Sequence, residues 1–177
     1  SGAAVAYYEG KIFFFCFATL SAKYSFFTGD FTNDFWQYNP LYETWQQLAN
    51  HHFLLWSSGS SGPGTGLPSG PLYTNGPAPA PTSGALMAGY NGGLFIIGAD
   101  ERCWRFDIQS RRWQEASSTN QPKFRSGMVS WVHNNQWFVL GAQSATSICT
   151  AASNELWVLD FATLHWDLRH AGGACNS

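Results

Sequence analysis

Short apolar stretches alternate with polar or small residues along this chain, and the pattern occurs three times. Each copy starts with Ser-Gly and continues with an apolar stretch, a two-residue turn and a second apolar stretch. The copies are "SGAAVAYYEGKIFFFCF" from residue 1, "SGALMAGYNGGLFIIGA" from 83 and "SGMVSWVHNNQWFVLGA" from 126. Apolar stretches of this length joined by such turns, of which Asn91-Gly92 is the strongest, are typical of β-hairpins. Each copy is therefore predicted to open with two strands.

Two tryptophans follow each predicted hairpin, always nine positions apart. The pairs are Trp36/Trp45, Trp104/Trp113 and Trp157/Trp166. On a helix, nine residues turn through about 900°, which would place the two rings on opposite sides. A strand, a tight turn and a second strand fit better, because turn-forming residues separate the tryptophans. These residues are Asn39-Pro40, Gln109-Ser110 and Ala162-Thr163. Four short strands per unit are predicted.

The repeats divide the chain into three units and one insertion. The segments are a first unit at 1–48, a Gly/Pro/Ser-rich insertion at 49–82, a second unit at 83–125 and a third at 126–177. The middle unit has the length of a four-stranded propeller blade with minimal loops. The insertion is too rich in Gly, Pro and Ser to form a core and is interpreted as a surface loop. Units 1 and 3 carry further long connections at 19–32 and 143–153.

The repeated residues resemble the kelch repeat over almost the whole chain outside the insertion. The motif "PKFRSG" at 122–127 is similar to a kelch repeat start, and "NDFWQYNPLYETW" and "NELWVLDFATLHW" look like kelch second halves. The glycine doublet of that family appears as Gly98-Ala99 and Gly141-Ala142, and is replaced by Cys16-Phe17 in unit 1. The resemblance implies an all-β fold, a kelch-type β-propeller arc of three four-stranded antiparallel blades.

Three blades are fewer than the four to eight of a typical propeller. Because each blade buries both faces against neighbours, a lone arc would expose an apolar face at each end. A longer propeller, a ring completed by other chains, or a head-to-tail filament would each solve this. All six paired tryptophans are expected to be buried between blades. Trp45→Ala is then expected to destabilise the fold by about 3–5 kcal/mol.

Composition narrows the functional classes. Charged residues make up 11% of the chain, the formal net charge is -2, and there are only three lysines: Lys11, Lys23 and Lys123. No basic stripe is available to neutralise phosphates, so nucleic-acid binding is disfavoured. The longest apolar runs, such as "IFFFCFA" at 12–18, are much shorter than the roughly 20 residues that span a bilayer, so no membrane span is expected in this segment.

Four cysteines bear on the cellular setting: Cys16, Cys103, Cys149 and Cys175. They allow three disulfide pairings, or they are buried free thiols. The even cysteine number, the few lysines and the many Ser, Thr and Gly residues favour an extracellular or secreted protein. The alternative is cytoplasmic, as for the intracellular kelch substrate adaptors.

No catalytic, cofactor or metal site is predicted. The GxSxG nucleophile motif is absent. His51 and His52 are adjacent, so on a strand they would point to opposite faces, and they are interpreted as loop residues. Asp30 and Asp34 lie in a turn-like stretch where capping is their expected role. The kelch resemblance also covers copper-radical galactose oxidases, but no stretch here matches their ligand motifs, and the chain is not expected to be an enzyme.

The function predicted from these observations is protein–protein interaction or self-assembly through blade edges and inserted loops. The partner is another protein or further copies of the chain. The alternatives are a carbohydrate-binding or galactose-oxidase-like extracellular propeller and a fragment of an intracellular kelch substrate adaptor. The candidate contact residues are aromatic: Tyr24, Phe26, Phe27, Phe31, Phe53, Trp56 and Tyr73. The four in the 19–32 connection either bind a partner or cover the edge of blade 1, and Phe53 and Trp56 belong either to an added strand or to a subunit contact.

Overall fold

The computed structural model describes residues 3–15, 35–49, 77–79, 84–98, 100–124, 127–141 and 155–171. These residues form twelve strands. The strands are β1 (Ala4–Tyr8), β2 (Lys11–Phe15), β3 (Phe35–Asn39), β4 (Thr44–Ala49), β5 (Leu86–Tyr90), β6 (Gly93–Ile97), β7 (Cys103–Asp107), β8 (Arg112–Glu115), β9 (Val129–His133), β10 (Gln136–Leu140), β11 (Leu156–Asp160) and β12 (His165–His170). The part of the chain that the structure describes contains no helix.

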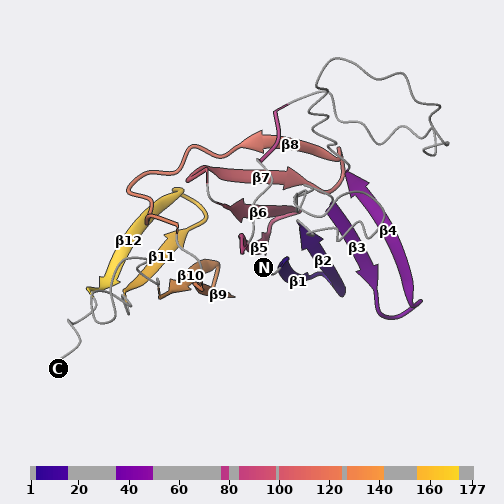
Figure 1. Cartoon of the computed structure of the whole chain (residues 1–177), viewed down its shortest axis with the longest axis horizontal. Coiled ribbons are helices and arrows are strands. Elements are labelled where there is room, and N and C mark those ends of the chain that lie inside the picture. The colour runs from indigo at the N-terminus through magenta and orange to yellow at the C-terminus, as the bar shows by residue number, and fades with distance from the viewer. Residues whose placement is uncertain are drawn as a thin grey trace, which may run out of the picture.

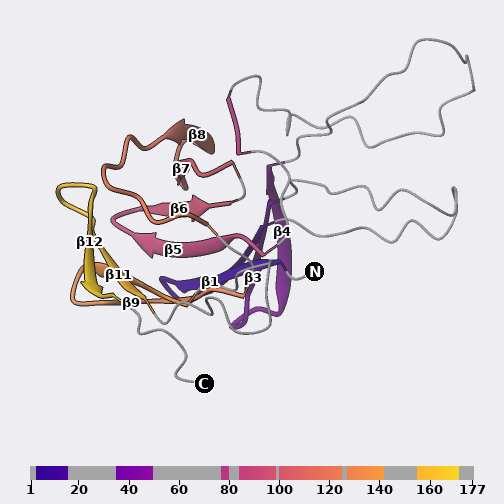
Figure 2. The same cartoon turned by 60° about the vertical axis from the view of Figure 1, so that its left-hand side comes forward.

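Each group of four consecutive strands forms one antiparallel sheet. Sheet 1 contains β1 to β4, sheet 2 contains β5 to β8 and sheet 3 contains β9 to β12, with the strands side by side in chain order. The sheets stand next to one another like blades of a fan (Figures 1 and 2). Their first strands are neighbours, with β1 beside β5 and β5 beside β9. The chain is thus a three-blade propeller arc, and the described sheets do not close a ring.

The first two strands of every sheet are joined by the predicted two-residue turns. Both turn residues have positive φ, as in Asn91 (45°) and Gly92 (69°), and in Asn134 (47°) and Asn135 (58°). Positive φ at both positions is the mark of a type I′ turn, whose twist suits a tight hairpin and which favours Asn and Gly. The hairpin prediction is confirmed in all three sheets, including sheet 1, where Glu9 (47°) and Gly10 (76°) form the turn.

Two hydrophobic cores lie between the sheets. The first core joins sheets 1 and 2, and the second joins sheets 2 and 3. Because successive side chains of a strand point to opposite faces, β6 contributes to both. Leu94 and Ile96 belong to the first core, whereas Phe95 and Ile97 belong to the second. Sheet 2 is therefore apolar on both faces, as a blade between two neighbours has to be.

The second tryptophan of each pair points toward the sheet that precedes it in the chain. Trp113 of β8 contacts Phe15 and Phe35 of sheet 1, with ring centroids 5.5 and 5.4 Å apart. Trp166 of β12 is fully buried in the second core, which contains residues of sheet 2. These two residues fit the expectation from the repeat.

Trp45 does not fit that expectation, and the prediction that it is buried between neighbours was wrong. Its side chain is 56% exposed. It rests on Phe14 and Tyr38 of its own sheet, with ring centroids 5.1 and 4.8 Å apart. The reason lies in its place in the arc: the side of sheet 1 to which Trp45 points is covered by no other described sheet. The first tryptophans differ as well, since Trp104 is buried whereas Trp36 and Trp157 are half-buried.

We predict that Trp166→Ala destabilises the fold by about 3–5 kcal/mol, because it removes a large buried side chain. Trp45→Ala is expected to cost about 1 kcal/mol or less, because that ring keeps much of its surface in water. Urea unfolding of both variants, followed by circular dichroism, measures the difference. Equal losses for the two variants would contradict the placement of Trp45 on an open face.

Candidate functional site

The outer face of sheet 1 is an open surface of apolar and aromatic side chains. The strand registers place seven such residues on the side opposite the first core. We call this set the leading face: Val5, Tyr7, Ile12, Phe14, Trp36, Tyr38 and Trp45. Val5 is 51% exposed and Tyr7 71% exposed. A gathering of large apolar side chains of this kind marks an interaction surface more often than a plain solvent-facing sheet.

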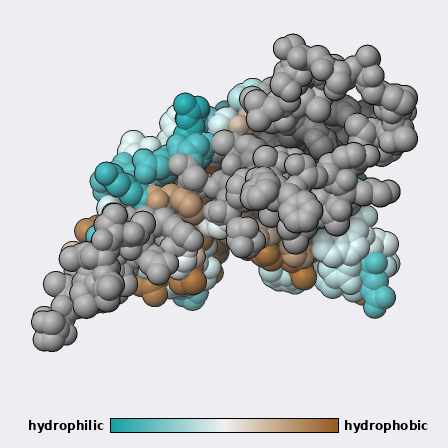
Figure 3. Space-filling view, viewed as in Figure 1, coloured by the Kyte–Doolittle hydropathy of each residue, from teal (hydrophilic) through white to brown (hydrophobic). Residues whose placement is uncertain are grey.

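The outer face of sheet 3 is the second open surface. The registers place six apolar residues on the side opposite the second core. We call this set the trailing face: Val129, Trp131, Phe138, Leu140, Leu156 and Val158. Val129 is 55% exposed, whereas Phe138, Leu140 and Leu156 are half-buried and Val158 is buried. Trp131 is 44% exposed and stacks on Phe138, with centroids 5.3 Å and planes 7° apart. Hydrophobic surface is visible at both outer sheets along the lower side of the arc (Figure 3).

The outermost strand of sheet 3 gives the trailing face a polar margin. On β12, Asp167 lies 3.6 Å from the His165 ring nitrogen and 3.6 Å from the Arg169 guanidinium. All three side chains are about half exposed, so these pairs contribute little to stability. An apolar centre with a polar margin is the usual arrangement of a protein-binding surface.

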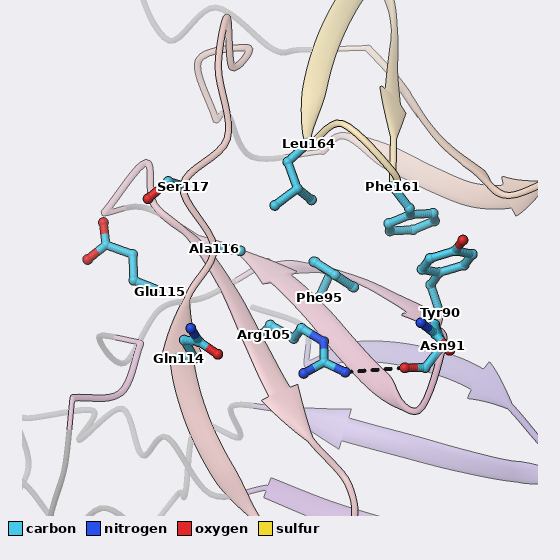
Figure 4. Close-up of a pocket in the computed structure, with 10 residues that line it drawn as sticks. All are labelled: Tyr90, Asn91, Phe95, Arg105, Gln114, Glu115, Ala116, Ser117, Phe161 and Leu164. Carbon is cyan, nitrogen blue, oxygen red and sulfur yellow. Dashed lines mark hydrogen bonds between the residues drawn. The ribbon is translucent and has the colours of Figure 1, made fainter.

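A pocket of about 440 Å³ lies between sheets 2 and 3 (Figure 4). Its apolar wall consists of Tyr90, Phe95, Ala116, Phe161 and Leu164, and its polar side of Asn91, Arg105, Gln114, Glu115 and Ser117. Tyr90 and Phe161 stack face to face, with centroids 4.4 Å and planes 4° apart. Their flat faces are turned toward each other and not toward the pocket (Figure 4). The pocket therefore offers ring edges and aliphatic side chains together with scattered polar groups.

The Arg105 guanidinium in this pocket is held by two partners. It donates to the Asn91 carbonyl oxygen at 3.2 Å and to the Asp107 carboxylate at 3.3 Å. The same carboxylate accepts from the Ser110 amide and hydroxyl, both at 2.7 Å. The Ser110 bonds, with a smaller contribution from Arg105, lower the pKa of Asp107. The carboxylate therefore stays ionised and fixes the position of the arginine.

The two sheet junctions differ at the register position of Gly89. At the first junction the Tyr8 ring lies directly on Gly89, where an added Cβ would collide with the ring. Tyr8 also accepts a hydrogen bond from the Gly92 amide at 2.8 Å. At the second junction Val132 occupies the register position of Gly89 and is 42% exposed. There Tyr90, which has the register position of Tyr8, stacks on Phe161, and both rings line the pocket.

Cys103 is a free thiol, buried in the second core. Burial, with a smaller contribution from the charge of Asp100, raises its pKa to about 12. For Cys103, the buried-thiol alternative of the sequence analysis is the one that holds. Cys16, Cys149 and Cys175 lie outside the described residues.

All seven contact residues predicted from the sequence also lie outside the described residues. These are Tyr24, Phe26, Phe27, Phe31, Phe53, Trp56 and Tyr73. The two sheet faces, whose exposure at the ends of the arc the repeat predicts but whose residues it does not name, are the surfaces that the described residues offer. The strands "AVAYY" and "VSWVH" already indicated these faces in the sequence, because each places apolar residues on both of its sides. Within the described ranges, no cluster of metal-ligating side chains and no helix capable of spanning a membrane is found.

Comparison with known proteins supports the fold. No family model matches the chain, and no curated protein matches it. Among solved structures, the chain is similar to the one titled "Structure of YjhT", with a TM-score of 0.59 and 14% identity. The match covers 98% of this chain and 53% of that one, so the chain spans about half the length of that structure. At this identity the likeness concerns the fold alone, and it agrees with a partial propeller.

We predict that Cys103 in the folded chain does not react with iodoacetamide at pH 8, because the thiolate is the reactive form and burial keeps the thiol protonated. The pKa of Cys103 is higher in the folded than in the unfolded chain. The free energy of unfolding therefore decreases through this group only as the pH rises from about 9 toward 12. Peptide mass spectrometry after native and denatured labelling measures the difference. Labelling of Cys103 at equal rates in both states would show that the thiol is accessible.

Proposed function

We propose that the chain is a non-enzymatic protein-interaction module of the kelch type, and that it binds protein through the open faces of its outer sheets. The observation that carries the proposal is the exposure of the leading face of sheet 1. Trp45 is 56% exposed, whereas the equivalent Trp113 and Trp166 are 7% and 0% exposed. The same position in three repeats is thus covered twice and open once.

The chemistry of the leading face suits a protein partner. All seven of its residues are aliphatic or aromatic, and aromatic side chains are the ones that most often dominate binding energy at protein interfaces. Tyr7 and Trp45 present both ring surface and a polar group, which favours contact with a surface that also contains backbone donors and acceptors. Only 11% of the residues of the whole chain are charged, so electrostatic steering contributes little to the association with a partner.

Protein binding is favoured over carbohydrate binding for this arc. A sugar is usually held against the free flat face of an aromatic ring. In the pocket between sheets 2 and 3, the Tyr90 and Phe161 rings stack face to face, and the Phe161 ring is also parallel to the Trp137 ring, with centroids 6.4 Å apart. An extracellular setting is also part of the proposal, and it rests on the low lysine number and the composition of the chain.

Photocrosslinking tests the interaction surface. We expect p-benzoylphenylalanine in place of Tyr7 to form protein adducts in cells that express the chain. The matched control is the same replacement of Tyr42, which is equally exposed at 71% but lies in the turn between β3 and β4, away from the leading face. Adduct yield at position 7 should exceed that at position 42 by about tenfold.

Equal yields at the two positions, or none at either, would contradict a protein-binding role for the leading face. The adducts are identified by mass spectrometry, so the result also separates two kinds of partner: a copy of the chain itself and an unrelated protein.

A further inference from the structure

We infer that the leading face of sheet 1 binds the trailing face of sheet 3 in a second copy of this chain. This inference rests on the proposed function and names its partner. It follows from comparing the two junctions inside the chain with the two open faces at its ends.

The leading face of sheet 1 has a counterpart in both other sheets. In sheet 2 the equivalent residues are Met87, Gly89, Leu94, Ile96, Trp104, Phe106 and Trp113, and in sheet 3 they are Ser130, Val132, Trp137, Val139, Trp157, Leu159 and Trp166. In sheet 2 these residues pack on sheet 1, and in sheet 3 the five on β10, β11 and β12 pack on sheet 2, whereas Val132 on β9 is 42% exposed. The leading face of sheet 1 is therefore one half of a junction that the chain makes twice.

The trailing face of sheet 3 is the other half of the same junction. Its equivalents are Ala4, Ala6, Phe13, Phe15, Phe35 and Gln37 in sheet 1, and Leu86, Ala88, Phe95, Ile97, Cys103 and Arg105 in sheet 2. The apolar ones are buried in the core shared with the sheet that follows, whereas Gln37 is buried and Arg105 half-buried at the position of Val158. The two ends of the arc thus carry unlike, complementary faces. Such faces pair head to tail, and pairing between two identical faces would not reproduce either internal junction.

The internal junctions predict particular contacts between copies. Trp113 contacts Phe15 at 5.5 Å and Phe35 at 5.4 Å. The residues equivalent to these two phenylalanines in sheet 3 are Leu140 and Leu156. Trp45 of one copy is therefore expected to pack on Leu140 and Leu156 of the other.

The innermost strands are where the contact between copies differs from the internal junctions. Trp131 takes the position of Ala6 and Ala88, so its larger ring fills more space against Val5 and Tyr7 of the other copy. Val5, Tyr7 and Trp131 are among the exposed members of the two faces, so pairing removes water-accessible apolar surface at this place.

The length of the arc agrees with pairing of two copies. Nearly the whole chain aligns with about half of a solved structure of the same fold, so two arcs have together about the length of that structure. A head-to-tail contact closes a ring when its rotation matches the ring, and two copies then make two identical contacts. Closure strengthens the pair, because the second contact forms within one complex.

Sedimentation velocity with two single-face variants tests the pairing. Trp45→Glu places a charge on the leading face and Trp131→Glu places one on the trailing face. Both side chains are substantially exposed in the single chain, so both variants are expected to fold. Leu41→Glu is the matched control, because Leu41 is 77% exposed in the β3–β4 turn, outside both faces. Circular dichroism confirms folding of each protein.

We expect the unmodified chain and Leu41→Glu to be dimers at about 50 μM, and each single-face variant alone to dissociate at least tenfold more readily. An equimolar mixture of the two variants should regain association, since each supplies the face that the other lacks. The mixed dimer has one contact instead of two and should be weaker than the unmodified dimer.

Association of Trp45→Glu alone as strong as that of the unmodified chain would overturn the inference. A mixture no more associated than its parts, or an unmodified chain that stays monomeric at about 200 μM, would overturn it as well. If position 7 then still crosslinks to an unrelated protein, the proposed function stands and only the second copy as partner is wrong.

Discussion

The structure depends on one constraint: a four-stranded blade that is apolar on both faces has to be covered on both faces. Sheet 2 satisfies it, because its alternating residues Leu94 and Phe95 enter two different cores. Sheets 1 and 3 satisfy it on one side only, within the described residues. The exposed side chains of Val5, Tyr7, Trp45, Val129 and Trp131 are the direct result. The proposed interaction surfaces are thus consequences of the fold.

One repeated tryptophan shows how strongly position in the arc decides the role of a residue. Trp113 and Trp166 are core residues because a sheet lies in front of them, and Trp45 is a surface residue because none of the described sheets does. A change at the same repeat position therefore has different consequences in different units. In the middle of the arc it affects a buried core, and at the end of the arc it affects the face that we propose binds a partner.

Local features of the fold could be predicted from the sequence, and features that depend on neighbouring sheets could not. The nine-residue tryptophan interval and turns such as Asn91-Gly92 involve residues close in the chain, so strands and hairpins followed from them. Whether Trp45 is buried depends on a neighbouring sheet, which the repeat alone does not supply. The pocket could not be predicted either, since residues far apart in sequence line it, such as Tyr90 and Phe161. The predicted loop contacts at Tyr24 and Phe53 lie outside the described residues and stay predictions.

The central claim is that the two end faces are the two halves of one repeated junction. Hydroxyl-radical footprinting of the unmodified chain over a range of concentrations measures this directly, residue by residue. The account predicts that Trp45 and Trp131 become protected together, with the same midpoint concentration, while Tyr42 in the β3–β4 turn stays reactive throughout. Protection of only one of the two tryptophans, or unchanged reactivity of both up to about 200 μM, would contradict it.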